Sequence, residues 1–150
     1  MPQSLVKMFV HIVFSTKHRA NLITPEIEPQ LFGYMSGIVE NNSSKLILAN
    51  GTENHAHLLV SLGKTICISE LIADIKRDSS KWIKPQGREF REFHWQKGYG
   101  AFSVGQSQVK DVMKYIANQK AKHKKTSFED EFRHFLRKYE IEYDERYVWD

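Results

Sequence analysis

The sequence contains very little cysteine and no long apolar run. Its single cysteine, Cys67, cannot form an intramolecular disulfide, and its place between Ile66 and Ile68 is typical of a small buried apolar residue. No stretch approaches the roughly 20 apolar residues that a membrane-spanning helix needs, and the N-terminus lacks the pattern of a secretory signal peptide. These absences predict a protein without membrane association in a reducing compartment, the cytoplasm.

Glycine and proline are also scarce, with 8 and 4 residues among 150, which excludes collagen-like and low-complexity chains. A chain of this length is expected to form one domain, residues 1–150. Its charge is uneven: residues 1–125 contain 18 Lys and Arg against 10 Asp and Glu, whereas residues 126–150 contain 4 against 8. The basic body favours a polyanionic partner, because Lys and Arg displace the counterions that surround phosphates.

Hydrophobic periodicity predicts alternating strands and helices. Strand-like runs occupy 6–14, 45–49, 54–62 and 99–104, and apolar residues at helical spacing occupy 25–41, 69–84 and 108–122. Asn50 and Gly51 are expected to form the turn of a hairpin. A tail at about 126–150 adds an amphipathic helix and several aromatic residues. This order predicts an α+β fold, a ferredoxin-like antiparallel sheet with helices on one face.

His55 and His57 flank Ala56 within a predicted strand. Because alternate side chains of a strand share a face, both imidazoles are expected to point the same way, about 6 to 7 Å apart along the backbone. This spacing suits two ligands of one divalent cation. Two histidines on a sheet face are equally compatible with a solvated surface, so a metal site needs a third ligand from elsewhere.

The helix predicted at 108–122 offers such a ligand. At about 100° per residue, Tyr115 and Gln119 are vertical neighbours at the edge of the apolar stripe, and Gln108 and Lys122 lie on the same flank. This edge presents a phenol, two amides and an ammonium in a row. The structural alternative is a tyrosine that snorkels at the boundary of the core.

In this order, these features resemble the single-tyrosine (Y1) HUH transposases of the IS200/IS605 family. The resemblance covers nearly the whole chain. It comprises a His-hydrophobe-His strand, a Trp-x-Lys-Gly-Tyr segment before the last strand, and a helical Tyr followed four residues later by Gln. The matching segments are HAHLLV at 55–60, WQKGY at 95–99, FSVG at 102–105 and YIANQ at 115–119. His-x-His alone is nonspecific, whereas the ordered combination is specific.

The resemblance implies an activity and a role for each motif residue. Members of the family cut single-stranded DNA with the tyrosine hydroxyl, form a 5′-phosphotyrosine intermediate and pass the strand to a 3′-hydroxyl. Tyr115 would be the nucleophile, and His55, His57 and Gln119 would hold Mg²⁺ or Mn²⁺. The resemblance also implies a homodimer, in which the tyrosine helix of one subunit can complete the histidine site of the other, and recognition of a DNA hairpin at the element ends.

Cationic side chains outside these motifs are candidates for contacts with the phosphates of the hairpin. They follow the first strand, lie on the solvent side of the helix at 69–84, or lie on the tyrosine helix: Lys17, Arg19, Lys76, Arg77, Lys81 and Lys122. A solvated charged surface explains each of these clusters nearly as well.

Three alternative functions remain open. A domesticated relative would keep the fold and bind single-stranded DNA or structured RNA without cutting it, although the intact Tyr115 and Gln119 argue against this. A phosphoesterase with a His-x-His-x-His motif would need a histidine at position 59, where the chain has Leu59. An HUH nickase of replication or conjugation is chemically close, but such proteins are usually longer.

Overall fold

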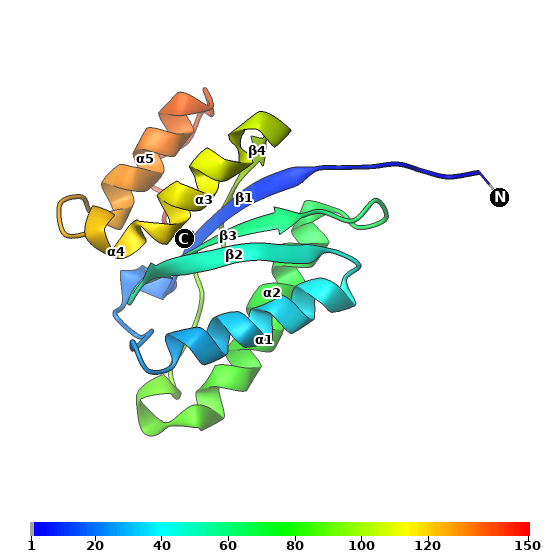
Figure 1. Cartoon of the computed structure of the whole chain (residues 1–150). Coiled ribbons are helices and arrows are strands. Elements are labelled where there is room, and N and C mark those ends of the chain that lie inside the picture. The colour runs from blue at the N-terminus through cyan, green and yellow to red at the C-terminus, as the bar shows by residue number, and fades with distance from the viewer. Residues whose placement is uncertain (1) are drawn as a thin grey trace.

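The computed structural model describes residues 2–150, and Figure 1 shows the arrangement of its helices and strands. Four strands form one sheet in the order β2-β3-β1-β4, and every neighbouring pair is antiparallel. This confirms the predicted α+β class and the antiparallel sheet. The main elements are β1 (Phe9–Ser15), α1 (Glu28–Asn41), β2 (Lys45–Thr52), β3 (His55–Ser61), α2 (Ile68–Ile83), β4 (Gly100–Val104), α3 (Val109–Ala117), α4 (Gln119–Lys122) and α5 (Phe128–Lys138).

Different helices cover the two faces of the sheet (Figure 1). Helices α1 and α2 pack on one face, in the ferredoxin-like manner that the sequence predicts, whereas α3, α4 and α5 lie over the other. The strands alternate accordingly: Ile12 and Phe14 of β1 belong to the core beneath α1 and α2, and Val13 packs with Phe132 and Phe135 of α5. The prediction of helices on one face therefore holds for α1 and α2 only, because the C-terminal helices bury the second apolar face.

The hairpin that carries the histidines turns later than the sequence predicts. Strands β2 and β3 stay paired as far as Thr52 opposite His55, so the turn is at Glu53 and Asn54 rather than at Asn50 and Gly51. Any Cβ at Gly51 would collide with the backbone carbonyl of His55. The glycine therefore permits a close approach of two strands instead of forming a turn.

The tyrosine helix is interrupted where a continuous helix is predicted. Helix α3 ends at Ala117, and α4 begins after Asn118, whose φ of −97° and ψ of 13° lie outside the helical range. The side-chain amide of Asn50 in β2 donates to the carbonyl oxygens of Ile116 and Ala117 at 2.9 and 3.2 Å. These carbonyls at the helix end thus have partners outside the helix. The break is followed directly by Gln119, which is fully buried.

The C-terminal tail folds back onto the body of the protein. The indole of Trp149 packs beside the rings of Phe128 and Phe132 of α5. The backbone carbonyl oxygen of Trp149 accepts a hydrogen bond of 2.8 Å from the Arg19 guanidinium. The last residues therefore brace α5 against the segment that follows β1.

The single cysteine lies in surroundings different from those predicted. Cys67 is exposed rather than buried: it occupies the N-cap position of α2 without a side-chain cap hydrogen bond, and its Sγ lies 3.3 Å from Oγ of Ser69. Among the helices of residues 2–150, none combines the length and apolarity needed to cross a membrane.

Candidate metal and tyrosine site

Two imidazoles of β3 face the side of the sheet that α3, α4 and α5 cover. His55 and His57 are both 0% exposed, and their ring centroids lie 5.1 Å apart. Ala56 between them belongs to the core on the opposite face. The strand therefore presents the histidines as its alternation predicts, but in the interior rather than on a solvated surface.

The polar edge of the tyrosine helix meets this histidine pair. Gln119 Oε1 lies 3.0 Å from His55 Nε2. Tyr115 is half-buried, and its ring centroid lies 5.9 Å from that of His57. The structure thus brings together the four residues predicted to bind metal or act as nucleophile. In this arrangement all four belong to the same chain.

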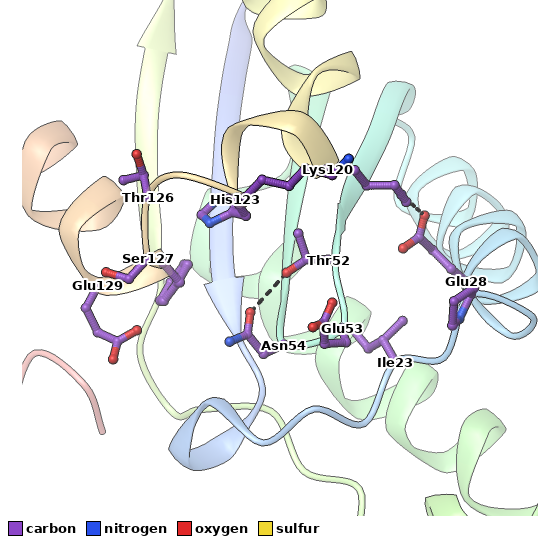
Figure 2. A pocket seen from close by; sticks show the side chains of 13 residues that line it. Ile23, Glu28, Thr52, Glu53, Asn54, Lys120, His123, Thr126, Ser127 and Glu129 are labelled. Carbon is purple, nitrogen blue, oxygen red and sulfur yellow. Dashed lines mark hydrogen bonds and ion pairs between the residues drawn. The ribbon is translucent and has the colours of Figure 1, made fainter.

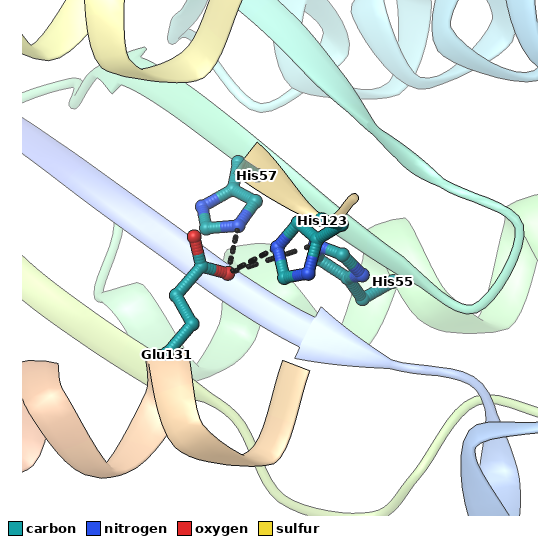
Figure 3. Close-up of side chains that lie close together, drawn as sticks. All are labelled: His55, His57, His123 and Glu131. Atoms are coloured by element: carbon teal, nitrogen blue, oxygen red, sulfur yellow. Dashed lines mark hydrogen bonds and ion pairs between the residues drawn. The ribbon is translucent and has the colours of Figure 1, made fainter. Parts of the chain in front are cut away.

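Glu131 of α5 lies at the centre of this group, as Figure 3 shows for its contacts with the histidines. Its Oε1 is 2.9 Å from Nε2 of His57 and 2.9 Å from Nε2 of His123. Its Oε2 accepts hydrogen bonds from the Tyr115 hydroxyl and from the Gln119 amide. One carboxylate therefore links the Tyr115 hydroxyl, the histidine pair and the loop that follows α4.

Sequence reasoning missed both Glu131 and His123. Glu131 does carry a signal, because it shares helical spacing with Phe128, Phe132 and Phe135 and thus places a charge on the apolar face of α5. His123 follows a lysine-rich segment and has no periodic pattern of its own. Its position in the site depends on the turn between α4 and α5.

Burial keeps the imidazoles of His55 and His11 neutral. Burial, followed by the proximity of His57, lowers the pKa of His55 to about 3, and the same two causes lower the pKa of His11 to about 3. Neutral imidazole retains the lone pair through which histidine binds a metal. The site is therefore electrostatically prepared to accept a cation.

The tyrosine and the carboxylate respond to burial in opposite ways. Burial raises the pKa of Tyr115 well above its ordinary value, and the hydrogen bond to Glu131 raises it further. Burial alone would raise the pKa of Glu131, but hydrogen bonds from His123 and His57 outweigh it and hold this pKa far below its usual range. The site therefore combines a neutral phenol with an ionised carboxylate.

The donor atoms fit a divalent cation. His55, His57, His123 and Glu131 each offer one ligand atom, and these atoms all lie within 4.8 Å of one another. Ligands that surround one ion at about 2.0 to 2.2 Å are themselves separated by about 3 to 4 Å. The four side chains are therefore close enough to converge on a single ion with small adjustments.

Both ring nitrogens of His55 have polar partners. Its Nδ1 lies 2.9 Å from Asn54 Oδ1, and its Nε2 lies 3.0 Å from Gln119 Oε1. A neutral imidazole has only one N–H to donate, and both partners are oxygen acceptors. The Thr52 hydroxyl, 3.0 Å from Nδ1, can donate to this nitrogen, so that Nε2–H donates to Gln119. A cation between Nε2 and Gln119 Oε1 would replace this hydrogen bond by shared coordination.

Comparison with known families agrees with this geometry. Residues 4–119 match the family described as transposase IS200 like. The chain belongs to this transposase family. The matched region includes Tyr115, Gln119 and both strand histidines, and it ends before His123 and Glu131. No curated protein matches the chain.

Two solved structures resemble this IS200-like transposase. A proposed transposase from Deinococcus radiodurans R1 superposes with a TM-score of 0.62 at 19% identity, over 79% of this chain and 98% of that chain. A REP-associated tyrosine transposase bound to a REP hairpin gives a TM-score of 0.61 at 12% identity, over 82% of this chain and 73% of that chain. At these identities the similarity establishes the fold.

Two cavities of the transposase reach the site from different sides. One, of about 430 Å³, extends from His123 past Lys120 to Glu28 (Figure 2). The other, of about 630 Å³, is lined by Tyr115 and four lysines: Lys114, Lys122, Lys124 and Lys125. We call this second cavity the lysine groove. Its concentrated positive charge next to the phenol would attract the phosphates of a nucleic acid.

The cations predicted to contact DNA lie in separate regions. Lys122 belongs to the lysine groove, with its Nζ 5.8 Å from the centroid of the Tyr115 ring. Lys17 and Arg19 line another cavity, of about 530 Å³, together with Trp149. Of these three cations, only Lys122 therefore lies next to the tyrosine.

The cations of α2 have different surroundings from those predicted. Lys76 is half-buried rather than freely exposed, and its Nζ donates to the carbonyl oxygens of Gln96 and Gly98 at 2.8 and 2.5 Å. Burial also lowers the pKa of Lys76 to about 8. Arg77 and Lys81 are exposed as predicted, but α2 covers the face of the sheet opposite to the site.

Proposed function

We propose that this protein is a metal-dependent single-stranded DNA transposase that cleaves and rejoins strands through a 5′-phosphotyrosine on Tyr115. The observation that carries the proposal is the position of the Tyr115 hydroxyl. It donates to Glu131, whose other oxygen lies 2.9 Å from His57, and it borders the lysine groove. Membership of a transposase family supports a DNA-cleaving enzyme.

The side chains of the site suggest how cleavage would proceed. Tyr115 Oη would attack the scissile phosphorus while the bond from phosphorus to the 3′-oxygen breaks. The phenol proton would pass through Glu131 Oε2 to solvent, and the departing 3′-oxygen would take up a proton from water to become a 3′-hydroxyl. The downstream strand stays on Tyr115 as a 5′-phosphotyrosine. Attack by a 3′-hydroxyl reverses the step, so rejoining needs no nucleotide cofactor, in agreement with the absence of a G-x-x-x-x-G-K motif.

A divalent cation completes this chemistry. His55, His57 and Gln119 would hold Mg²⁺ or Mn²⁺. Two of their donor atoms, His55 Nε2 and Gln119 Oε1, already lie 3.0 Å apart. When bound, the cation polarises the scissile phosphate and stabilises the charge that develops during displacement. The neutral Tyr115 would otherwise be a poor nucleophile at neutral pH.

We infer that the substrate is a single-stranded DNA hairpin. One structural neighbour is bound to a REP hairpin, and the lysine groove offers cations for phosphates beside Tyr115. A homodimer would bring two element ends together, and we predict that it forms. Sedimentation with and without the hairpin would measure this association.

Covalent capture tests the proposal. The hairpin oligonucleotide should carry its label at the 3′ end, because the 5′-phosphotyrosine retains the downstream strand. We expect an SDS-stable adduct with Mn²⁺ and none with Tyr115→Phe, which should still bind the hairpin in a gel shift. Tyr147→Phe is the matched control, since Tyr147 is 63% exposed.

Two results would contradict the proposal. An adduct that persists in Tyr115→Phe would show that another residue is the nucleophile. Hairpin binding by the wild-type protein without any adduct would favour the non-catalytic relative with the same fold.

A further inference from the structure

We propose that His123 and Glu131 are also metal ligands, so that the site has three imidazoles, one carboxylate and the Gln119 amide and prefers a first-row transition-metal ion to Mg²⁺. The inference rests on the proposed function, because it concerns the cation of the same site. It adds two ligands that lie beyond residues 4–119, the part of the chain that matches the family.

The first argument is the convergence of the donor atoms. Nε2 of His57 and Nε2 of His123 each lie 2.9 Å from Glu131 Oε1, and Nε2 of His55 lies 3.7 Å from the same oxygen. Three imidazoles from a strand and a loop therefore point at one carboxylate oxygen from a helix (Figure 3). Unrelated surface histidines would not be expected to point their Nε2 atoms at the same carboxylate oxygen.

The second argument is the charge of Glu131. Its side chain is 1% exposed, and among residues 2–150 its ion-pair partners are three histidines rather than Lys or Arg. A buried carboxylate is costly unless a cation compensates it. A divalent ion at the focus of the imidazoles would supply this compensation. The nearby lysines instead line the groove outside the site.

The third argument concerns access and connection to the reaction. His123 lines the cavity that opens beside Lys120, so an ion could enter from that side. Glu131 Oε2 meanwhile accepts the Tyr115 hydroxyl. As a ligand through Oε1, Glu131 would join the cation to the nucleophile in a single side chain.

The donor set determines the metal preference. Mg²⁺ binds almost entirely through oxygen and keeps several waters, whereas imidazole suits Zn²⁺, Co²⁺ and their neighbours. A site with three imidazole nitrogens and one carboxylate oxygen therefore favours the transition-metal ions. Two histidines and an amide alone would give a weaker preference.

Titration of the metal-free full chain with Co²⁺, without DNA, tests the proposal, with visible absorption as the readout and Mg²⁺ as competitor. We expect one Co²⁺ per chain that millimolar Mg²⁺ does not displace. Glu131→Gln and His123→Asn should each weaken Co²⁺ binding at least about tenfold and change the absorption spectrum. Glu142→Gln, an exposed acid outside the site, is the matched control for the charge change.

The outcomes separate this inference from the proposed function. Wild-type Co²⁺ affinity and spectrum in both variants would overturn the ligand assignment, as would ready displacement by Mg²⁺. If both variants bound Co²⁺ normally but His57→Asn lost Co²⁺ binding, His123 and Glu131 would not be ligands, while the metal site of the proposed function would still stand. Thermal unfolding of each variant verifies that the chain is folded. A wild-type chain that binds Co²⁺ as expected but forms no adduct with the hairpin would contradict the proposed function alone.

Discussion

Nε2 of His11 lies 2.9 Å from Nδ1 of His57, in the interior of the sheet face that carries the site. The two residues come from the neighbouring strands β1 and β3, where His11 is paired with Leu59 rather than with His57. The contact therefore runs diagonally across the ladder. Since the other nitrogen of His57 faces Glu131, His11 holds the orientation of this imidazole from its second ring nitrogen.

Replacement of this supporting histidine should weaken the reaction without removing a catalytic group. In His11→Phe, we expect Mn²⁺-dependent adduct formation to fall about 10- to 100-fold, because partners that orient metal-binding histidines typically have effects of this size. A Mn²⁺ titration of the rate should show that more metal is required. His94→Phe is the control, since His94 is exposed. Equal loss in both variants would exclude a specific role for His11.

The buried histidines should make the protein sensitive to acid. The pKa of His11 and of His55 is lowered from 6.5 to about 3 in the folded chain, first by burial and then by His57. Below pH 6.5 the unfolded chain therefore binds more protons than the folded chain. The free energy of unfolding should fall between pH 6.5 and 3, by up to about 3 kcal/mol per pH unit for two such groups.

Urea denaturation at a series of pH values would measure this dependence. We expect the slope to be smaller in His11→Phe, which removes one of the two groups. A free energy of unfolding that stays constant or increases as the pH falls below 6.5 would be inconsistent with neutral buried imidazoles.

The contact between Asn50 and the end of α3 should affect both stability and activity. Asn50→Ala removes the hydrogen bonds to the carbonyl oxygens of Ile116 and Ala117, at an expected cost of about 1 to 2 kcal/mol. Because this contact lies where α3 stops, Gln119 should also lose its fixed position. The measured consequence is a slower rate of adduct formation.

Asn42→Ala is the matched control for this prediction. Its amide donates to the Ile38 carbonyl at 2.9 Å, at the end of α1 and away from the site. We expect a similar loss of stability with an unchanged adduct rate. Equal losses of adduct rate in the two variants would assign the effect of Asn50 to stability alone.

The lysine groove should supply the electrostatic part of DNA binding. In Lys122→Ala, the slope of log affinity against log salt for the hairpin should decrease by about 0.7 to 0.9 for each phosphate that the lysine neutralises in the wild type. Lys81→Ala, on α2, should leave the slope unchanged, because this helix covers the opposite face of the sheet. If Lys81→Ala decreased the salt slope more than Lys122→Ala did, the DNA would lie on the face of the sheet opposite to Tyr115, which would contradict the prediction.

Much of the fold follows from short-range patterns. Alternation of apolar residues predicts the strands, and helical spacing predicts α1 and α2 to within a few residues, because both depend on neighbours in sequence. The shared face of His55 and His57 is predictable for the same reason. The hairpin turn and the break at Asn118 are not, because they depend on contacts across the chain, such as the clash that a side chain at Gly51 would make with the His55 backbone.

The sequence by itself determined which residues could act: a histidine pair on a strand, and a tyrosine and a glutamine on one flank of a helix. Only the tertiary structure decided that these groups meet within one chain, and that His123 and Glu131 join them. The hydrogen bond between Glu131 and His57 spans 74 residues. Its geometry depends on how Phe128, Phe132 and Phe135 pack α5 against the sheet, a sum of many weak contacts that no local pattern contains.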